Sequence, residues 1–248
     1  MKESIYALGW DVGGWMGKNN SFVFIKVDTE KMDLNWFIPK SNYQIKKGAL
    51  FDLDKIIQDL YDQDISDDIN LVIGIDAPLT FPEEFIKFLL NKNIYIKKPD
   101  KEIYNKLAYR ETDRLLYQKY SKKPLSATFD RLGNNATVAI SHIRYWQEKY
   151  NIYINPLKFE NNMINIIETY PAMLKPGKYE KAFDKIDDLI PESIEHGTDC
   201  YDAALCALMA VQFSFDNKFD KLPSLVYPTE NKEFYQKEGW IYHFDIER

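Results

Sequence analysis

The first third of the chain alternates short apolar runs with polar turns, which is the pattern of a β-sheet. A run at residues 5–11 ends in Asp11, and further runs follow at 21–27 and 34–38. Apolar runs of this length between polar turns predict strands. Short turns between consecutive strands favour an antiparallel meander. We therefore expect three antiparallel strands to open the fold.

A helix and a fourth strand are predicted next. Apolar residues follow helical spacing from Leu53 to Leu60, behind Asp52, which is suited to cap a helix. The run at 71–75 is apolar throughout, as in a central strand that is covered on both faces. It is expected to stop before Pro78, because proline cannot donate to a strand ladder.

The middle of the chain, residues 82–156, indicates helices and no strong strand. Candidate helices lie at 83–90, 102–120 and 134–150, and the last carries apolar residues at intervals of three or four. We interpret this region as a helical insertion, or lid, within a single domain that covers residues 1–248.

The remainder returns to the pattern of a sheet. A fifth strand is predicted at 163–168, a helix at 179–190 and a short edge strand at 239–243. The run from Asp199 to Val211 is apolar on every side, so we expect it to form a helix in the interior. The complete pattern predicts a mixed α/β sheet, with three antiparallel strands, then parallel strands, and flanking helices.

Composition limits the partners that the chain is expected to have. Its 248 residues are 45% hydrophobic, and its 32 basic and 38 acidic residues give a net charge of −6. This balance argues against a broad nonspecific grip on nucleic acid and is compatible with a local basic groove. Cys200 and Cys206 lack the spacing of a disulfide or metal motif. The chain opens without the pattern of a signal peptide and has no apolar run of membrane length, so we expect a cytoplasmic protein with no membrane partner.

Five acidic residues stand at the ends of apolar segments. Asp11, Asp76 and Glu168 each close a predicted strand, whereas Asp199 and Asp202 open the apolar helix. A carboxylate in such a place is costly to dehydrate unless a positive charge lies against it. The carboxyl ends of parallel strands meet at one ligand crevice, and residues three apart share a helix face. The pattern therefore predicts a shared cation.

The donor atoms indicate which cation to expect. Carboxylate oxygens without neighbouring His or Cys suit Mg²⁺ or Mn²⁺ better than Zn²⁺. Two such ions, about 3.5–4 Å apart, activate a water and stabilise the leaving oxygen in phosphodiester hydrolysis.

The same residues resemble a known family over nearly the whole chain. That family is the domain of unknown function 429 family, whose members are regarded as predicted nucleases of the ribonuclease H-like superfamily. The Asp-x-x-Asp-Ala start of the last long helix is also similar to that of the Holliday-junction resolvase branch. The segments that carry the resemblance are Gly9-Trp10-Asp11-Val12-Gly13-Gly14-Trp15, Gly74-Ile75-Asp76-Ala77-Pro78-Leu79, Arg110-Glu111-Thr112-Asp113-Arg114, Glu168-Thr169-Tyr170-Pro171-Ala172, Asp199-Cys200-Tyr201-Asp202-Ala203-Ala204-Leu205 and Glu238-Gly239-Trp240-Ile241.

The resemblance implies a ribonuclease H-like fold with the helical insertion between strands 4 and 5. It matches Asp11 to the metal ligand of the first strand, Asp76 to the acid of the fourth strand, and Asp202 with Asp199 to the acids of the terminal helix. Glu168 falls in the family's Glu-x-Tyr-Pro segment. We accordingly predict Asp11, Asp76 and Asp202 as metal ligands, and Asp199 and Glu168 as auxiliary ligands or groups that orient water.

These acids also have structural interpretations. Asp11 and Asp76 fit turns, and Glu168 precedes a Tyr-Pro pair that matters for shape. Thr198 or Asp199 fits the cap of a helix whose first turn favours acids without any metal.

Two arginines are candidates for binding substrate. Arg110 and Arg114 suit a phosphate clamp, because guanidinium groups bind phosphate in bidentate fashion. Their spacing fits a solvated helix face with ion pairs equally well.

The predicted function is a nuclease, a hydrolase that depends on Mg²⁺ or Mn²⁺ and acts on nucleic acid or a nucleotide. One alternative is an actin-like ATPase or sugar kinase, which uses a related sheet. Such proteins usually need two related domains and glycine-rich phosphate loops, which a chain of 248 residues with 10 glycines fits poorly. The other alternative is a non-catalytic binding protein with the same fold. The choice among DNA, RNA and nucleotide, and the oligomeric state, stay open.

Overall fold

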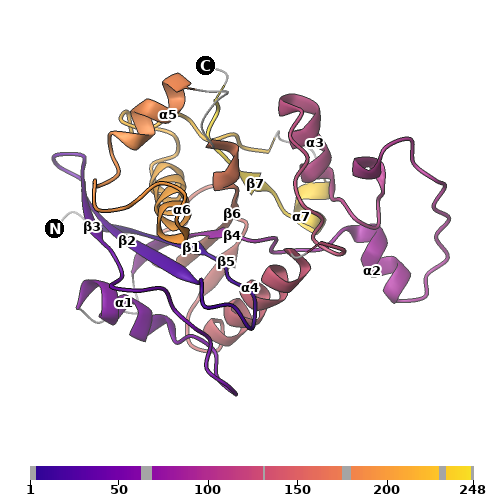
Figure 1. Cartoon of the computed structure of the whole chain (residues 1–248), viewed down its shortest axis with the longest axis horizontal. Helices are drawn as coiled ribbons and strands as arrows, with labels where there is room; N and C mark the ends of the chain where they lie inside the picture. The colour runs from indigo at the N-terminus through magenta and orange to yellow at the C-terminus, as the bar shows by residue number, and fades with distance from the viewer. Residues whose placement is uncertain (1–3, 63–68, 131, 175–179, 229–232, 247–248) are drawn as a thin grey trace.

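A mixed seven-stranded sheet forms the centre of this computed structural model (Figure 1). The structure describes residues 4–62, 69–130, 132–174, 180–228 and 233–246. Within these ranges the strand order is β3-β2-β1-β4-β6-β5, and β7 pairs with the carboxyl end of β6. The strands are β1 (Ile5–Asp11), β2 (Ser21–Asp28), β3 (Asp33–Phe37), β4 (Asn70–Asp76), β5 (Ile152–Ile154), β6 (Ile164–Thr169) and β7 (Ile241–Tyr242).

The predicted strand directions are confirmed. β1, β2 and β3 are antiparallel neighbours, and β4 then lies parallel to β1 while β6 lies parallel to β4. β1, β4 and β6 form the middle of the sheet. β4 and β6 are buried along nearly their whole length, and β1 is buried from Ala7 to Trp10. Their continuous apolar runs are explained by this position, because helices cover both faces of the sheet.

Helices form a layer on each face. α1 and α4 pack on one face together with the side chains of Leu8, Trp10 and Ile73. α6 packs on the other face together with Ala7, Val72 and parts of α3 and α5. Figure 1 shows α1 and α4 below the sheet and α5 and α6 above it. The helices are α1 (Leu53–Tyr61), α2 (Glu83–Leu89), η1 (Glu102–Tyr104), α3 (Glu111–Tyr120), α4 (Leu132–Trp146), η2 (Pro171–Leu174), α5 (Glu180–Asp187), α6 (Asp199–Ser214) and α7 (Phe234–Glu238).

Two glycines allow α6 to lie directly on the sheet. Gly9 of β1 and Gly74 of β4 are Cα partners on the parallel strands. A Cβ on Gly9 would overlap the backbone of Ala203 and Ala207, and one on Gly74 would overlap the carbonyl oxygen of Cys206. The missing side chains therefore let the helix backbone approach β1 and β4, which fixes the helix above the ends of these strands.

The region at 82–156 differs in part from its prediction. The helix predicted at 102–120 is interrupted: η1 ends at Tyr104 and α3 begins only at Glu111. The Asn105 side chain accepts from the Leu107 backbone N–H (3.1 Å), a local turn that competes with helix, and Arg110 is extended. The short strand β5 was not predicted. α2 has no buried residue and projects with η1 at the right of Figure 1.

Other predictions near the ends of elements vary in outcome. Asp52 caps α1 as predicted, with its side chain accepting from the Asp54 N–H. The strand predicted at 239–243 is shorter and pairs with β6. Tyr179, predicted to start a helix, and residues 1–3 lie outside the described residues.

The cysteines and helices show two further properties of the described ranges. Cys200 and Cys206 are free thiols, and Cys206 is fully buried as a small core residue. No helix in these ranges has both the length and the apolar character needed to cross a membrane.

Candidate functional site

Asp11 and Asp76 stand side by side at the carboxyl ends of two central parallel strands. They are Cα partners where β1 and β4 end. Side chains alternate between the two faces of a sheet, so both aspartates belong to the same face as Gly9 and Gly74. That face is the one that α6 covers.

The first turn of α6 adds two carboxylates at this end of the sheet. The Thr198 side chain accepts from the Tyr201 N–H (3.2 Å), so Thr198 and not Asp199 is the helix cap. Asp199 and Asp202 then occupy the first turn. The Asp199 carboxylate accepts a hydrogen bond from the Asn42 side chain (2.8 Å).

The four aspartates influence one another electrostatically. Burial and the charges of Asp76, Asp202 and Asp199, in that order, raise the pKa of Asp11 to about 9, and a hydrogen bond with Asp199 contributes. Each cause favours the protonated acid. Asp11 forms no ion pair with any residue that the structure describes. We call these four residues the aspartate cluster.

The donor atoms of the aspartate cluster fit a hard divalent cation. They are carboxylate oxygens, which Mg²⁺ and Mn²⁺ prefer, and a cation would offset the repulsion that raises the pKa of Asp11. As the side chains stand, the described ranges contain no group of three or more His, Cys, Asp or Glu residues arranged to hold a metal ion. The carboxylates would therefore have to rotate toward a common point to bind one.

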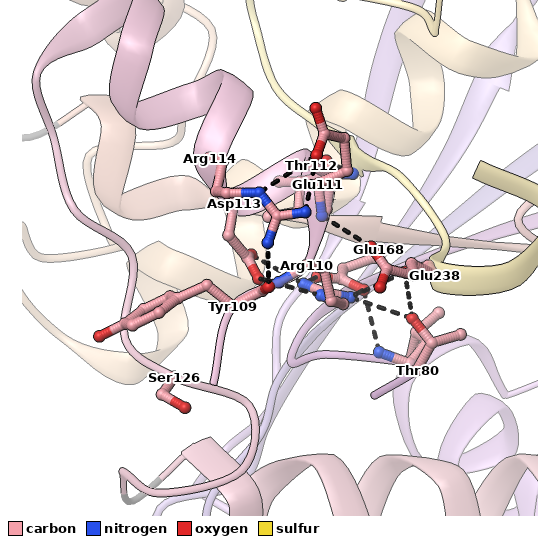
Figure 2. Close-up of polar contacts among 12 residues, drawn as sticks. Thr80, Tyr109, Arg110, Glu111, Thr112, Asp113, Arg114, Ser126, Glu168 and Glu238 are labelled. Atoms are coloured by element: carbon pink, nitrogen blue, oxygen red, sulfur yellow. Dashed lines mark hydrogen bonds and ion pairs between the residues drawn. The ribbon is translucent and has the colours of Figure 1, made fainter. Parts of the chain in front are cut away.

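A second group of acids surrounds Arg110, and we call it the Arg110 network (Figure 2). The guanidinium donates to Glu168 through Nη1 (2.7 Å) and Nη2 (2.5 Å), and to Asp113 through Nη2 (3.1 Å) and Nε (3.2 Å). Nη1 also donates to the Thr80 hydroxyl (3.2 Å). All five N–H groups of the Arg110 guanidinium thus have protein acceptors, and its side chain is 1% exposed.

The charges in this network compensate one another. Burial lowers the pKa of Arg110, but Asp113 and Glu168 outweigh it, so the net shift is upward and the guanidinium stays charged. Burial raises the pKa of Glu168, while Arg110 and the Leu79 backbone N–H oppose that rise. Removing any one partner would leave a buried charge without compensation.

Glu168 belongs to the Arg110 network and not to the aspartate cluster. Its Cα partner is Ile75, so strand alternation directs it to the face opposite Asp76. Its Oε2 accepts from the Leu79 N–H (2.9 Å), which ties down the turn that follows Asp76. A small cavity of about 20 Å³, lined in part by Asp76, Glu168 and Arg110, lies between the two groups. The predicted role of Glu168 at a metal remains a prediction.

The two arginines predicted to clamp phosphate are engaged by the protein itself. Arg110 is buried and fully used by Asp113, Glu168 and Thr80, which differs from a solvated helix face. Arg114 donates to the Glu111 carboxylate (2.6 Å) and to the Tyr109 carbonyl (2.6 Å). All five donors of Arg110 are therefore occupied, and Arg114 uses three of its five N–H groups within the protein.

Sequence reasoning missed one residue of the site. Asn42 is separated from Asp199 by 157 positions and lies in a polar loop between β3 and α1. Its only sequence signal is an ordinary turn residue next to Ser41, which predicts a loop and no contact.

Comparisons with protein-family models, with curated proteins and with solved structures each found no match.

Proposed function

We propose that the chain is a metal-dependent nuclease with a ribonuclease H-like fold, in which the helical segment between β4 and β6 is an insertion. The observation that carries this proposal is the in-register pair of Asp11 and Asp76 beneath the first turn of α6, which holds Asp199 and Asp202. Carboxylates from two adjacent parallel strands and one helix supply oxygen ligands from three directions. This is the arrangement expected of a site for a hard cation.

Asp11, Asp76 and Asp202 would hold Mg²⁺ or Mn²⁺. When bound, such ions polarise a phosphoryl oxygen and make a water more acidic, which favours hydrolysis of a phosphodiester. Asp199, which accepts a hydrogen bond from Asn42, would orient a water or complete the ligand set.

The Arg110 network acts as a positioning element in this proposal. Glu168 binds the Leu79 N–H, three residues beyond Asp76, and is itself held by Arg110. A rigid turn at this point would keep the backbone at Asp76 in one place, as a ligand set needs. Glu168 therefore supports the site from outside the ligand set.

A cleavage assay with a matched control tests the proposal. Labelled single-stranded DNA, single-stranded RNA, duplex DNA and a four-way junction are incubated with the protein in Mg²⁺ or Mn²⁺, and separately in EDTA. We expect cleavage of at least one substrate, abolished by EDTA and lowered at least 100-fold by Asp11→Asn. Asp33→Asn, at an exposed aspartate paired with Lys221, should cleave like the wild type.

The outcome that contradicts the proposal is equally specific. Cleavage that survives EDTA or the Asp11→Asn substitution would show that another site is responsible. Absence of cleavage on every substrate, together with no binding of Mn²⁺, would leave a non-catalytic protein.

A further inference from the structure

A large pocket between the loop that precedes α1, the first turn of α1 and α4 is lined by lysines and aromatic rings. It lies on the side of the sheet that α1 and α4 cover, opposite the face to which Asp11 and Asp76 belong. Its volume is about 1100 Å³, and its walls include Trp15, Lys46, Lys47, Lys55 and Tyr145. We call it the lysine pocket. Pockets for small molecules usually measure about 300–1,000 Å³, so this one has room for a segment of a longer ligand.

A short segment of the chain joins each wall of the lysine pocket to a residue of the aspartate cluster or to a residue that binds the cluster. One wall continues from Asn42, which donates to Asp199, through Tyr43, whose N–H donates to the Asn20 carbonyl (2.6 Å). The chain then forms the loop that carries Lys46 and Lys47, which projects at the bottom of Figure 1. The segment that enters this loop is therefore hydrogen-bonded to the aspartate cluster at Asp199.

The other wall is held by the loop after β1. Trp15 lies four residues beyond Asp11, and its indole N–H donates to the Thr137 hydroxyl of α4 (2.9 Å). In the same loop the Gly13 N–H donates to the Asn20 side chain (3.0 Å). These hydrogen bonds fix the ring of Trp15 at a set position relative to Asp11.

The charge of the pocket opposes that of the whole protein. The chain carries a net charge of −6, yet the pocket walls bring together Lys46, Lys47 and Lys55. These lysines are exposed, and none forms an ion pair with a residue in the described ranges. The one acid in the walls, Asp52, uses its side chain to cap α1. A local excess of free lysines attracts a polyanion.

The aromatic rings distinguish among polyanions. Tyr145 is 40% exposed, and Trp15 is partly exposed while its ring stacks against His142 (centroids 6.1 Å apart). Unpaired bases stack on such rings, whereas the bases of a duplex are already stacked on one another. Lysines for the phosphates and rings for the bases together suit a single strand.

We propose that the lysine pocket binds a single-stranded segment of nucleic acid and leads it to the aspartate cluster. This inference rests on the proposed nuclease function for the identity of the adjoining site. Lys46, Lys47 and Lys55 contact the phosphates, and Trp15 and Tyr145 stack with bases. The chemistry is common to DNA and RNA, so both are used as probes.

Fluorescence anisotropy in EDTA measures binding without cleavage. The probes are fluorescein-labelled single-stranded DNA, single-stranded RNA and duplex DNA of equal length. We expect the triple variant Lys46→Ala/Lys47→Ala/Lys55→Ala to bind a single strand at least 10-fold more weakly. Its salt dependence should also fall, by a slope of about 2, because about 0.7 counterion is released per phosphate contact on single strands.

Matched variants separate a specific pocket from general attraction. The control triple variant Lys92→Ala/Lys97→Ala/Lys98→Ala removes the same charge from exposed lysines at the projecting arm beyond α2 and should bind like the wild type. Tyr145→Ala, at a partly exposed ring, should weaken single-strand binding about 5-fold or more. Trp15→Phe should retain more binding than Trp15→Ala, because it keeps an aromatic face.

Three results would overturn the inference. They are equal weakening by the two triple variants, duplex binding as tight as single-strand binding, or no effect of the aromatic substitutions in variants that melt like the wild type. The failure of the nuclease proposal would look different. In that case the wild type binds the single strand through the lysine pocket but shows no metal-dependent cleavage, whereas cleavage that the pocket variants leave unchanged refutes the pocket alone.

Discussion

Two groups of acidic side chains lie near the carboxyl ends of β4 and β6, the aspartate cluster and the Arg110 network. In the network, Glu168 and Asp113 share one buried guanidinium. In the cluster, burial and the neighbouring carboxylates raise the pKa of Asp11 to about 9. The Arg110 network carries its own counter-charge, whereas the aspartate cluster has the electrostatics of a site that an external cation would complete. An acid at the end of a strand is therefore not sufficient to indicate a metal site.

The largest expected effect comes from breaking the compensated group. Arg110→Met leaves Glu168 and Asp113 buried without their partner, so we expect the free energy of unfolding to fall by about 3–5 kcal/mol. Chemical denaturation measures this change. Lys123→Met removes an exposed ion pair with Glu102 and should cost about 1 kcal/mol or less. Similar costs for the two variants would contradict the structural role of Arg110.

A substitution in the aspartate cluster should raise the free energy of unfolding, where Arg110→Met lowers it. The folded pKa of Asp11 is raised, so in the metal-free protein stability falls as pH rises from about 4 to about 9. Asp11→Asn removes this penalty, and we expect a gain of about 2–4 kcal/mol at pH 7, since one pKa unit corresponds to about 1.4 kcal/mol. Thermal melts in EDTA test the gain.

The same variant should lose its response to metal. Mg²⁺ or Mn²⁺ should raise the melting temperature of the wild type, because a ligand that binds only the folded state stabilises it. Asp11→Asn should show little or no rise. A destabilised Asp11→Asn, or one that metal stabilises as much as the wild type, would contradict the comparison.

The close contact between α6 and the sheet can be tested by substituting Gly9. Gly9→Ala forces a methyl group into the backbone of Ala203 and Ala207, so we expect a loss of about 3 kcal/mol, at the upper end for overpacking. Gly48→Ala, at a positive φ in open space, should cost about 1 kcal/mol. Denaturation midpoints compare the two. Gly9→Ala should also weaken metal binding, because Asp199 and Asp202 move with α6.

Lowering the pH should destabilise the protein through His243, whereas it stabilises the protein through Asp11. His243, beside Tyr120 of α3, has its pKa lowered by burial to about 4. A histidine whose pKa is lowered in the folded state makes the protein less stable as the pH falls below the ordinary histidine pKa of about 6.5. Between pH 7 and pH 5 this amounts to about 2 kcal/mol. His243→Gln should remove that dependence, which denaturation at the two pH values measures; an unchanged dependence would contradict it.

Hydrophobic patterning was sufficient for the main elements of the sheet. The antiparallel order of β1, β2 and β3 follows from their short turns, and the central place of β4 follows from its continuous apolar run. The acidic ends of these strands could be read from sequence, but the pairing of β1 with β4 could not. β5 could not, because three residues such as Ile152-Tyr153-Ile154 carry too little periodicity. The break before α3 was also missed, since it depends on where Arg110 finds its partners.

The partners of the acids could not be read from sequence, because they lie far from the acids along the chain. Arg110 meets Glu168 across 58 positions, and Asn42 meets Asp199 across 157. Only the folded chain brings these pairs together. The end of a strand places Glu168 near the aspartates in sequence terms, whereas the direction of its side chain depends on the register with β4.

Crystals soaked in Mn²⁺ and measured at the manganese absorption edge test the central claim most directly. The account predicts anomalous density between Asp11, Asp76 and Asp202, and none beside Glu168. Density beside Glu168 and Asp113, or no density at the aspartate cluster at saturating Mn²⁺, would contradict it.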